Sequence, residues 1–300
     1  MTSSLANYLL LILLAAIFGS NFMMTKISVA EIEPLWIVGS RLALAAVVLV
    51  IVMLIARSAW PKGQVWIWLV LTAIFGHALP YFLITWGQEV VDAGLSAIFM
   101  AIMPLFTILI AHLVTDDEKL SRWVLMGFAL AFAGVVVLFG VDKLASFDGT
   151  SLRQYALLGA ALCYGVNAVM TKKLTGLAWQ SMAAIQVGLA VCVTLPVILV
   201  ISPPLPIDVS TKALVALLYT GIMPTAVGAI MVLVLIRRAG AAFLSQINFL
   251  VPLFGTAFAI VFLGEHLPAN AAIALLLILA GVALARWRPN REPLSINRGA

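Results

Sequence analysis

The chain has 300 residues, of which 64% are hydrophobic and 10% are charged, and its formal net charge is +5. A soluble domain of this length needs a far more polar surface. Apolar runs of about 20 residues, long enough to cross a bilayer as a helix, recur from end to end. The composition predicts a polytopic membrane protein and excludes most enzymes that carry their active site in a water-soluble domain.

The apolar runs are separated by charges, Pro and Gly. The first run begins at Leu5 without a positive segment before it, so we expect a retained span rather than a signal peptide. A backbone in lipid must satisfy its own hydrogen bonds, so runs this long are helices. In chain order the predicted spans are about 5–26, 35–56, 65–87, 93–114, 120–140, 153–172, 181–201, 212–236, 241–263 and 268–286.

The basic residues are distributed unequally between the two sides that these spans define. With the N-terminus in the cytoplasm, the outer segments carry Lys26, Lys143, Arg153 and Lys212. The inner segments carry Arg57, Lys62, Lys119, Arg122, Lys172, Lys173, Arg237, Arg238, Arg286, Arg288, Arg291 and Arg298. Because Lys and Arg are enriched in cytoplasmic loops, both termini are expected in the cytoplasm.

One phrase occurs twice, as FGSNFMMTK from Phe18 to Lys26 and as YGVNAVMTK from Tyr164 to Lys172. Other matches follow at nearly the same offset: Pro104 with Pro252, Glu118-Lys119-Leu120 with Glu265-His266-Leu267, and Gly134 with Gly281. The pattern predicts a duplicated unit of five spans, at residues 1–145 and 146–287, followed by a cytoplasmic tail at 288–300. Five is odd, so the second copy is inverted in the membrane, an arrangement typical of secondary transporters.

With these features, the chain resembles the EamA-type branch of the drug/metabolite transporter superfamily, and within it the aromatic amino-acid exporters. The resemblance rests on ten spans in two copies, Pro in the fourth and ninth spans, and the E-x-L…G-V ends of each copy. It implies a ten-helix all-α fold around a central cavity that opens alternately to either side. It also implies a bacterial inner-membrane location and a small-molecule substrate in a lipid bilayer.

Two asparagines occupy equivalent positions, Asn21 and Asn167, deep in the first and sixth spans. A carboxamide in hydrocarbon is costly unless it is paired. Two interpretations stay open: both face the cavity and bind a zwitterionic substrate or the opposing gate, or both bridge neighbouring helices. Tyr164 opens the second copy of the phrase and is assigned to the same substrate site. For Gly19 and Gly165, close helix approach is favoured over a hinge.

The third span holds the densest polar and aromatic cluster, in which His77 and Tyr81 are four residues apart and share a helix face. Pro80 between them frees a backbone carbonyl, and Pro224 is its counterpart in the eighth span. We expect helix hinges at Pro80, Pro104, Pro224 and Pro252. His77 has no counterpart in the second copy, so it is either a ligand or a packing residue.

The ninth span carries Ser245, Gln246 and Asn248 just before Pro252, too many polar residues for a lipid-facing stripe. We therefore expect Gln246 and Asn248 to line the cavity. The equivalent stretch of the fourth span supplies Met100, which offers an adaptable apolar surface unless it simply packs. Arg41 is a charged residue well inside the second span. It either attracts a substrate carboxylate or pairs with Glu31 or Glu33, and we expect the pairing.

Other features restrict the function. Cys163 and Cys192 lie in apolar runs without metal-ligand spacing, and both are expected to be small buried side chains. No Asp or Glu lies near the middle of a predicted span, so we favour facilitated movement or exchange over proton coupling, for which His77 is the alternative carrier.

We therefore expect an exporter of amino acids or similar small metabolites. A multidrug or cation exporter is the alternative, and a membrane-embedded enzyme or a scaffold is the alternative of another class. The function requires no cofactor and no metal, the basic residues are not a nucleic-acid signal, and the protein is expected to be a monomer that is not an enzyme.

Overall fold

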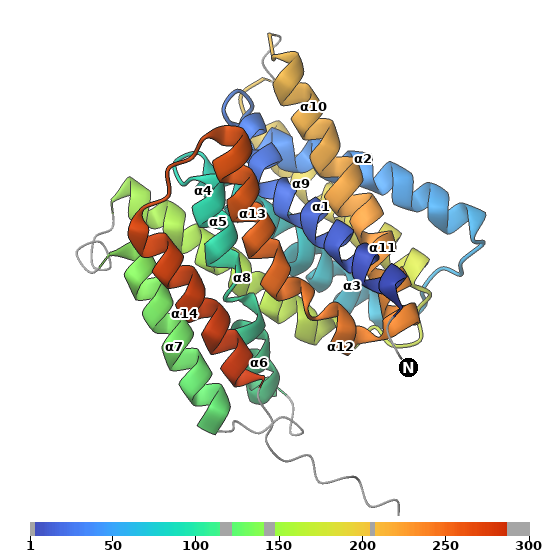
Figure 1. Cartoon of the computed structure of the whole chain (residues 1–300). Coiled ribbons are helices and arrows are strands. Elements are labelled where there is room, and N and C mark those ends of the chain that lie inside the picture. Colours follow the sequence, from blue (N-terminus) through green and yellow to red (C-terminus); the bar gives the residue numbers. More distant parts are fainter. Residues whose placement is uncertain (1–3, 115–121, 141–147, 205–207, 287–300) are drawn as a thin grey trace, which may run out of the picture.

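The computed structural model of the chain describes residues 4–114, 122–140, 148–204 and 208–286, which form helices joined by short turns, without a strand among them (Figure 1). The helices of the first half are α1 (Leu5–Val29), α2 (Pro34–Ile55), α3 (Val65–Ala73), η1 (Ile74–Ala78), α4 (Leu79–Gln88), α5 (Ala93–Met100), α6 (Met103–Val114) and α7 (Arg122–Phe139). Those of the second half are α8 (Gly149–Thr171), α9 (Trp179–Ile201), α10 (Thr211–Thr220), η3 (Gly221–Val227), α11 (Gly228–Ala239), α12 (Ala241–Leu244), α13 (Ile247–Leu263) and α14 (Ala269–Ala285).

The prediction of an all-α membrane protein is confirmed. In the part of the chain that the structure describes, 8 helical stretches are long and apolar enough to cross a membrane. The remaining two predicted spans coincide with α8 and with α14, which has 17 residues. The count of ten spans therefore stays a prediction, and the tail 288–300 and the match at Glu118–Leu120 lie outside the described residues.

Local sequence signals account for several helix ends. The carboxylate of Glu33 accepts the backbone N–H groups of Leu35 and Trp36 at the start of α2, where Pro34 occupies the first helical position. Gly264 ends α13 with a φ of 68°, in the left-handed region that favours glycine. These signals explain why the predicted and observed ends differ by only a few residues.

The helices of the two halves pack in a matching pattern. α1 packs against α13, and in the same way α8 packs against α5 and α6. α1 also contacts α10, as α8 contacts α4. The other pairs are α2 with α9 and α7 with α14, and the last pair lies side by side at one edge of the molecule (Figure 1). Apart from the short segment η1, each helix of the first half thus has its main partner in the second half.

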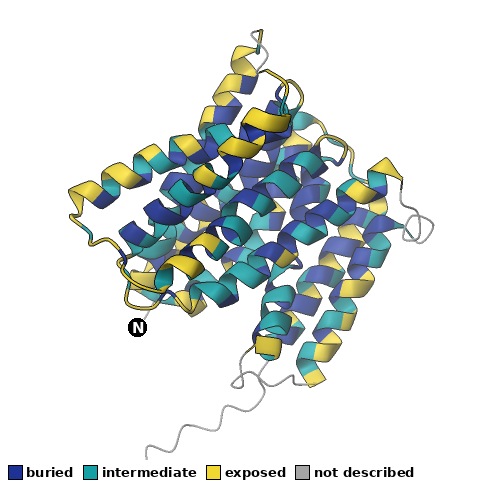
Figure 2. Cartoon of the chain, turned by 180° about the vertical axis from the view of Figure 1, so that it is seen from behind, coloured by how far each residue is buried: buried dark blue, intermediate teal, exposed yellow. Residues whose placement is uncertain are grey.

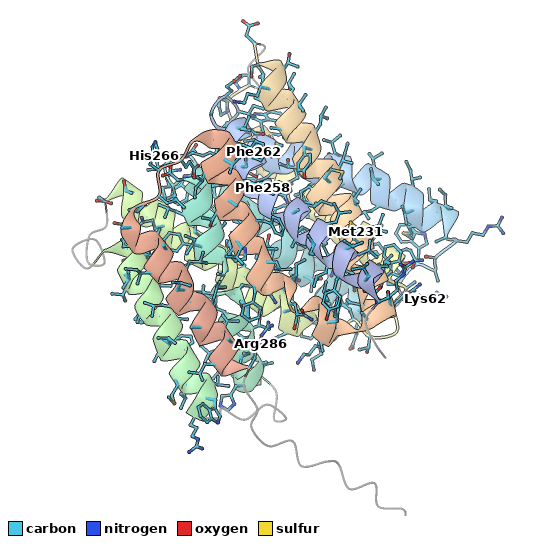
Figure 3. All side chains as sticks on the ribbon, in the orientation of Figure 1. Lys62, Met231, Phe258, Phe262, His266 and Arg286 are labelled. Atoms are coloured by element: carbon cyan, nitrogen blue, oxygen red, sulfur yellow. The ribbon has the colours of Figure 1, made fainter. Side chains whose placement is uncertain are left out.

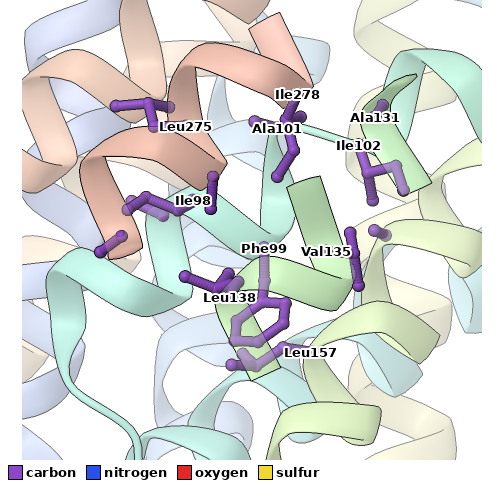
Figure 4. Close-up of a cluster of buried hydrophobic side chains, with 14 of the residues drawn as sticks. Ile98, Phe99, Ala101, Ile102, Ala131, Val135, Leu138, Leu157, Leu275 and Ile278 are labelled. Atoms are coloured by element: carbon purple, nitrogen blue, oxygen red, sulfur yellow. The ribbon is translucent and has the colours of Figure 1, made fainter. Parts of the chain in front are cut away.

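The largest apolar core fills the space between α5, α7, α8 and α14 (Figure 4). Phe99 lies at its centre, fully buried between Leu138 and Leu157, and its ring meets that of Phe139 edge-on with centroids 5.3 Å apart. Burying an aromatic side chain of this size contributes about 2–3 kcal/mol of stability. This core holds α5, which carries the predicted site residue Met100, in a fixed position.

Many large apolar side chains are exposed on the outer faces of the helices, where Figure 2 shows the exposed positions in yellow. Val200 is 81% exposed and Phe262 is 66% exposed, which fits contact with lipid rather than with water. Phe258 and Phe262 project from α13 as successive rings with centroids 5.8 Å apart (Figure 3). Cys163 is buried as expected, but Cys192 is exposed on α9, so the prediction was wrong there: an apolar run alone does not distinguish a lipid-facing position from a core position.

Candidate functional site

The third and eighth predicted spans are both interrupted near their middle by a π-helical segment. η1 lies between α3 and α4 and ends two residues before Pro80, and η3 lies between α10 and α11 and contains Pro224. π segments are often found at functional sites, because they widen a helix and turn its side chains. The two interruptions bring polar groups from α2, η1, α4 and η3 into one cluster.

This cluster is centred on Tyr81, which is buried. The guanidinium carbon of Arg41 lies 3.8 Å from the centroid of the Tyr81 ring, a cation–π contact. The Tyr81 hydroxyl is 3.4 Å from Nδ1 of His77, and the two rings meet edge-on with centroids 5.7 Å apart. The prediction that His77 and Tyr81 share a face thus agrees with their contact.

A proline in η3 explains how Arg41 is positioned. Pro224 has no N–H, so the α-helical hydrogen bond to the carbonyl four residues earlier, at Thr220, cannot form, and η3 takes the π register there. The hydroxyl of Thr225 donates to this carbonyl at 2.9 Å, and Nε of Arg41 donates to the same hydroxyl oxygen at 2.9 Å. The chain Arg41–Thr225–Thr220 therefore ties α2 to the interrupted span of the other half.

The expected pairing of Arg41 with Glu31 or Glu33 was wrong. Glu31 accepts the hydroxyl and the backbone N–H of Ser210, and Glu33 caps α2. The Ser210 hydroxyl and N–H lower the pKa of the Glu31 carboxyl. The Arg41 side chain does not extend along about two helical turns to reach these carboxylates, because Thr225 and Tyr81 are nearer partners.

The two equivalent asparagines each retain an acceptor without a donor. Asn21 is 8% exposed, and its Oδ1 has no hydrogen-bond partner in the structure. Oδ1 of Asn167 is likewise buried and unpartnered, and it faces Gly76 of η1 so closely that a Cβ built on Gly76 would lie 2.6 Å from it. Buried unpaired carbonyl oxygens are rare because they lose hydration without compensation. If these asparagines bridged neighbouring helices through their carboxamide oxygens, each Oδ1 would accept a hydrogen bond, and neither does.

The glycines beside the two asparagines allow close helix contact. A Cβ on Gly19 would lie 2.6 Å from Cβ of Phe254 and 2.8 Å from N of Gly255. A Cβ on Gly165 would lie 3.0 Å from Cβ of Phe106 and 3.0 Å from N of Thr107. Small residues that allow backbones to meet are typical of membrane helix interfaces. The close-packing interpretation of Gly19 and Gly165 therefore agrees with their surroundings.

The remaining predicted site residues have different surroundings. Tyr164 packs against both large apolar clusters, including the one that contains Tyr81, and Met100 packs against the core around Phe99. Gln246 is exposed in the turn between α12 and α13. Asn248 donates from Nδ2 to the carbonyl of Ser245 at 3.1 Å, so part of its polarity serves the same turn.

The predicted hinges lie at or near breaks in the helices. Pro104 is the second residue of α6, after the break at 101–102. Pro252 lies inside α13, six residues after the break at 245–246. The break in the ninth span is therefore displaced by about one helical turn from the position that the fourth span predicts. The two halves differ here, and the polar run at Ser245 and Gln246 coincides with this displaced break.

Sequence reasoning missed the polar ties between helices at the end of the bundle where Lys26 lies. Lys26 Nζ donates to the carbonyls of Gln88 at 2.7 Å and Val91 at 3.0 Å, and Nε2 of Gln88 donates to the carbonyl of Phe22 at 3.0 Å. The carboxylate of Glu265 accepts the N–H groups at the start of α5, with distances of 2.8 and 2.9 Å. A signal was present, because Lys26 and Glu265 both belong to the duplicated motifs.

Two hollows of about 400 Å³ each lie on the outer faces of the bundle, one between α5, α13 and α14 and one between α2 and α10. Both are lined mainly by apolar side chains, and neither contains Arg41, His77 or Tyr81. Their position fits acyl chains of lipid rather than a polar substrate. A central cavity around the Tyr81 cluster stays a prediction.

Comparison with known proteins adds independent information. The profile of the EamA-like transporter family matches residues 5–140 and 154–287. The "Uncharacterized transporter YoaV" of Bacillus subtilis is 23% identical, over 92% of this chain and 95% of its own. The "Probable terminal-alkyne amino-acid exporter" of Streptantibioticus cattleyicolor is 29% identical, over 87% of this chain and 85% of its own.

The "Probable amino-acid metabolite efflux pump" of Salmonella typhimurium is 27% identical, over 91% of this chain and 92% of its own. A solved crystal structure has the same fold, with a TM-score of 0.66 at 17% identity, covering 94% of this chain and 99% of that one. The similarity therefore extends over nearly the whole chain in both sequence and fold.

Proposed function

Because the chain belongs to the EamA-like transporter family, we propose that it exports amino acids, neutral or aromatic, or similar small metabolites. The observation that carries this proposal is the polar and aromatic cluster of Arg41, His77, Tyr81 and Thr225, formed where both halves interrupt a span. Relatives named as amino-acid exporters and efflux pumps support the substrate class.

The proposed mechanism is alternating access between two inverted copies, residues 1–145 and 146–287, with both termini in the cytoplasm and the protein in the bacterial inner membrane. The matching contacts of Gly19 with Phe254 and of Gly165 with Phe106 support a two-fold relation between the copies. Close contacts between helices that carry short breaks allow one copy to rock against the other without losing its core. Such movement needs no catalytic residue and no cofactor, so we propose a transporter that is not an enzyme.

The substrate site is proposed to lie between the two copies. Its residues are Asn21, His77, Tyr81, Met100, Tyr164, Asn167, Gln246 and Asn248, with Pro80, Pro104, Pro224 and Pro252 as hinges. The contacts of His77 with Tyr81 and the unpaired oxygens of Asn21 and Asn167 support the central members of this set. Gln246 is its weakest member, because it is exposed in a turn in the described conformation.

The experiment is counterflow in proteoliposomes with a panel of radiolabelled amino acids. We expect uptake of at least one neutral or aromatic amino acid, and loss of that uptake in the combined variant Asn21→Ala, His77→Ala and Gln246→Ala. If the wild type takes up an amino acid and the combined variant takes it up equally well, the proposed site is refuted but the proposed function is not. No uptake of any amino acid would refute the function.

Growth assays separate amino-acid export from the multidrug alternative. Cells that overproduce the protein are expected to resist fluorinated phenylalanine, because its zwitterion has the same charges as the proposed substrate. Resistance to quaternary amines alone would favour the drug exporter, which must accommodate a cation. A buried cation at Arg41 repels such a compound, which is the physical reason that we favour the zwitterion.

A further inference from the structure

Arg41 is a cation within a membrane-spanning helix. It is 5% exposed and lies on α2, and its partner Thr225 is in the middle of the stretch Thr211–Ala239. A charged side chain at this depth costs at least about 2.5–3.5 kcal/mol, and such residues usually mark substrate pathways or pair with an opposite charge. The buried charge of Arg41 therefore needs a compensating partner.

Three other cations at or near the span ends have anionic or carbonyl partners. Lys26 is bonded to two backbone carbonyls, Arg153 forms an ion pair with Glu89, and Arg286 donates to the carbonyl of Ser245 at 3.1 Å. Among the described residues, Arg41 forms no ion pair, and its hydrogen bond runs from Nε to a neutral hydroxyl. The terminal nitrogens carry four of the five guanidinium N–H groups.

The surroundings of Arg41 fix the plane of the guanidinium. Thr225 holds Nε from one edge, and the Tyr81 ring lies against one face at 3.8 Å. The remaining edge holds the two terminal nitrogens, the fork that binds a carboxylate through two parallel hydrogen bonds. Preorganisation of this kind lowers the entropy that is lost when a ligand binds.

A second observation comes from Asn167, which a series of contacts connects to Arg41. Arg41 contacts Tyr81, Tyr81 contacts His77, and the neighbour of His77 is Gly76, against which the unpaired Oδ1 of Asn167 is directed. This oxygen accepts hydrogen bonds and has no donor. A cationic donor and an orphan acceptor are the two kinds of group that bind the carboxylate and the ammonium of an α-amino acid.

We infer that Arg41 is the carboxylate-binding residue of the transported substrate, and that the carboxamide oxygen of Asn167 receives its ammonium group. Thr225 is the positioning residue that orients the guanidinium. The inference rests on the proposed function and deepens it, because it defines the substrate as a zwitterion with a free carboxylate. The rings of His77 and Tyr164 then remain for the side chain of the substrate.

The test uses four ligands that share a phenyl group and differ in their polar groups: phenylalanine, phenylalaninamide, 3-phenylpropionate and 2-phenylethylamine. Each competes with the radiolabelled amino acid that the wild type takes up fastest in counterflow. We expect the wild type to prefer phenylalanine to its amide by about 10-fold or more, the value of a charged hydrogen-bond pair. In Arg41→Gln the ratio is expected to fall to about 1. The absence of a preference in the wild type would overturn the inference without any variant.

Arg153→Gln is the matched control, because Arg153 also lies over an aromatic ring, 4.0 Å from the Trp86 centroid, but has an acidic partner. Its ligand preference is expected to equal that of the wild type. If Arg41→Gln does not give a monodisperse protein, Thr225→Val replaces it, and an acid-to-amide ratio unchanged from the wild type would refute the role of Arg41.

The remaining ligands separate this inference from the function. If no amino acid is transported, thermal stabilisation of the purified protein by 3-phenylpropionate but not by 2-phenylethylamine still supports a carboxylate site. Equal effects of these two ligands on the wild type would exclude the site. Transport of phenylalanine and its amide at equal rates would leave the exporter and remove the carboxylate site.

Discussion

The contact between Gly76 and Asn167 gives a sharp test of the site. Gly76 lies in η1, and a Cβ at this position would be 2.6 Å from Oδ1, 2.7 Å from Cγ and 2.9 Å from Nδ2 of Asn167. The methyl group that Gly76→Ala adds therefore clashes with all three atoms of the Asn167 carboxamide. Because the clash involves the end of a side chain and not the backbone, we expect the fold to survive and the carboxamide to move.

The size of the effect follows from this geometry. Ordinary van der Waals contact begins at 3.4 Å, so the carboxamide must retreat by about 0.8 Å. A displacement of that size weakens a hydrogen bond to the substrate, which is worth about 0.5–1.5 kcal/mol between neutral groups and more when one partner is charged. The affinity for the transported amino acid is therefore expected to fall by about 3- to 30-fold.

The assay is initial counterflow rate against substrate concentration, measured for Gly76→Ala, Asn167→Ala and the double variant. If Gly76→Ala acts through Asn167, it adds little in the Asn167→Ala background, so the two effects are strongly non-additive. Gly159→Ala on α8 is the control, because its Cβ would meet only Leu83 at 3.5 Å. Additive effects, or a Gly76→Ala protein with the wild-type affinity, would refute the reasoning.

Three further predictions concern stability. Gly127→Ala places a Cβ against the backbone of α14 at Gly281, so we expect the free energy of unfolding in detergent to fall by about 1–2 kcal/mol. Gly188→Ala, whose Cβ would have no atom within 4 Å, is expected to leave this free energy unchanged or to raise it by up to about 1 kcal/mol. A loss of stability in both variants would contradict this prediction. The lowered pKa of Glu31 means that its stabilisation is fully present above the unfolded carboxyl pKa and is lost as the pH falls through the lower folded pKa, so thermal melts of the wild type and Glu31→Gln should converge in acid. Glu89→Gln removes a partly exposed ion pair at the end of a span and should change stability by less than about 1 kcal/mol, and a larger loss of stability would refute this.

The sequence was sufficient for the helices but not for their interruptions. Long apolar runs between charges and prolines predict spans well, since lipid leaves the backbone no alternative to a helix. Pro80 and Pro224 indicated weak points in two spans, and η1 and η3 lie at these points. The π form itself was not predictable, because it depends on how Gly76 and Thr225 meet the other half.

The polar partners were harder to predict than the helices. Asn21 and Asn167 were found through the repeat, and His77 with Tyr81 through their spacing of four. The partner of Arg41 was missed because Thr225 is 184 positions away, and a single sequence gives no measure of such a contact. Gln246 was assigned to a cavity by composition alone, whereas its polarity also suits the turn that separates α12 from α13.

The two π segments also change which side of a span faces inward. A π turn holds an extra residue, so the angular phase of the helix slips by about 100° across it. Before η1 the buried positions include Leu69 and Thr72, and beyond it they include Tyr81, Ile84 and Gln88. Deleting one residue within η1 would remove the slip and rotate either half of the span away from its neighbours, so this span should tolerate point substitutions far better than a change in length.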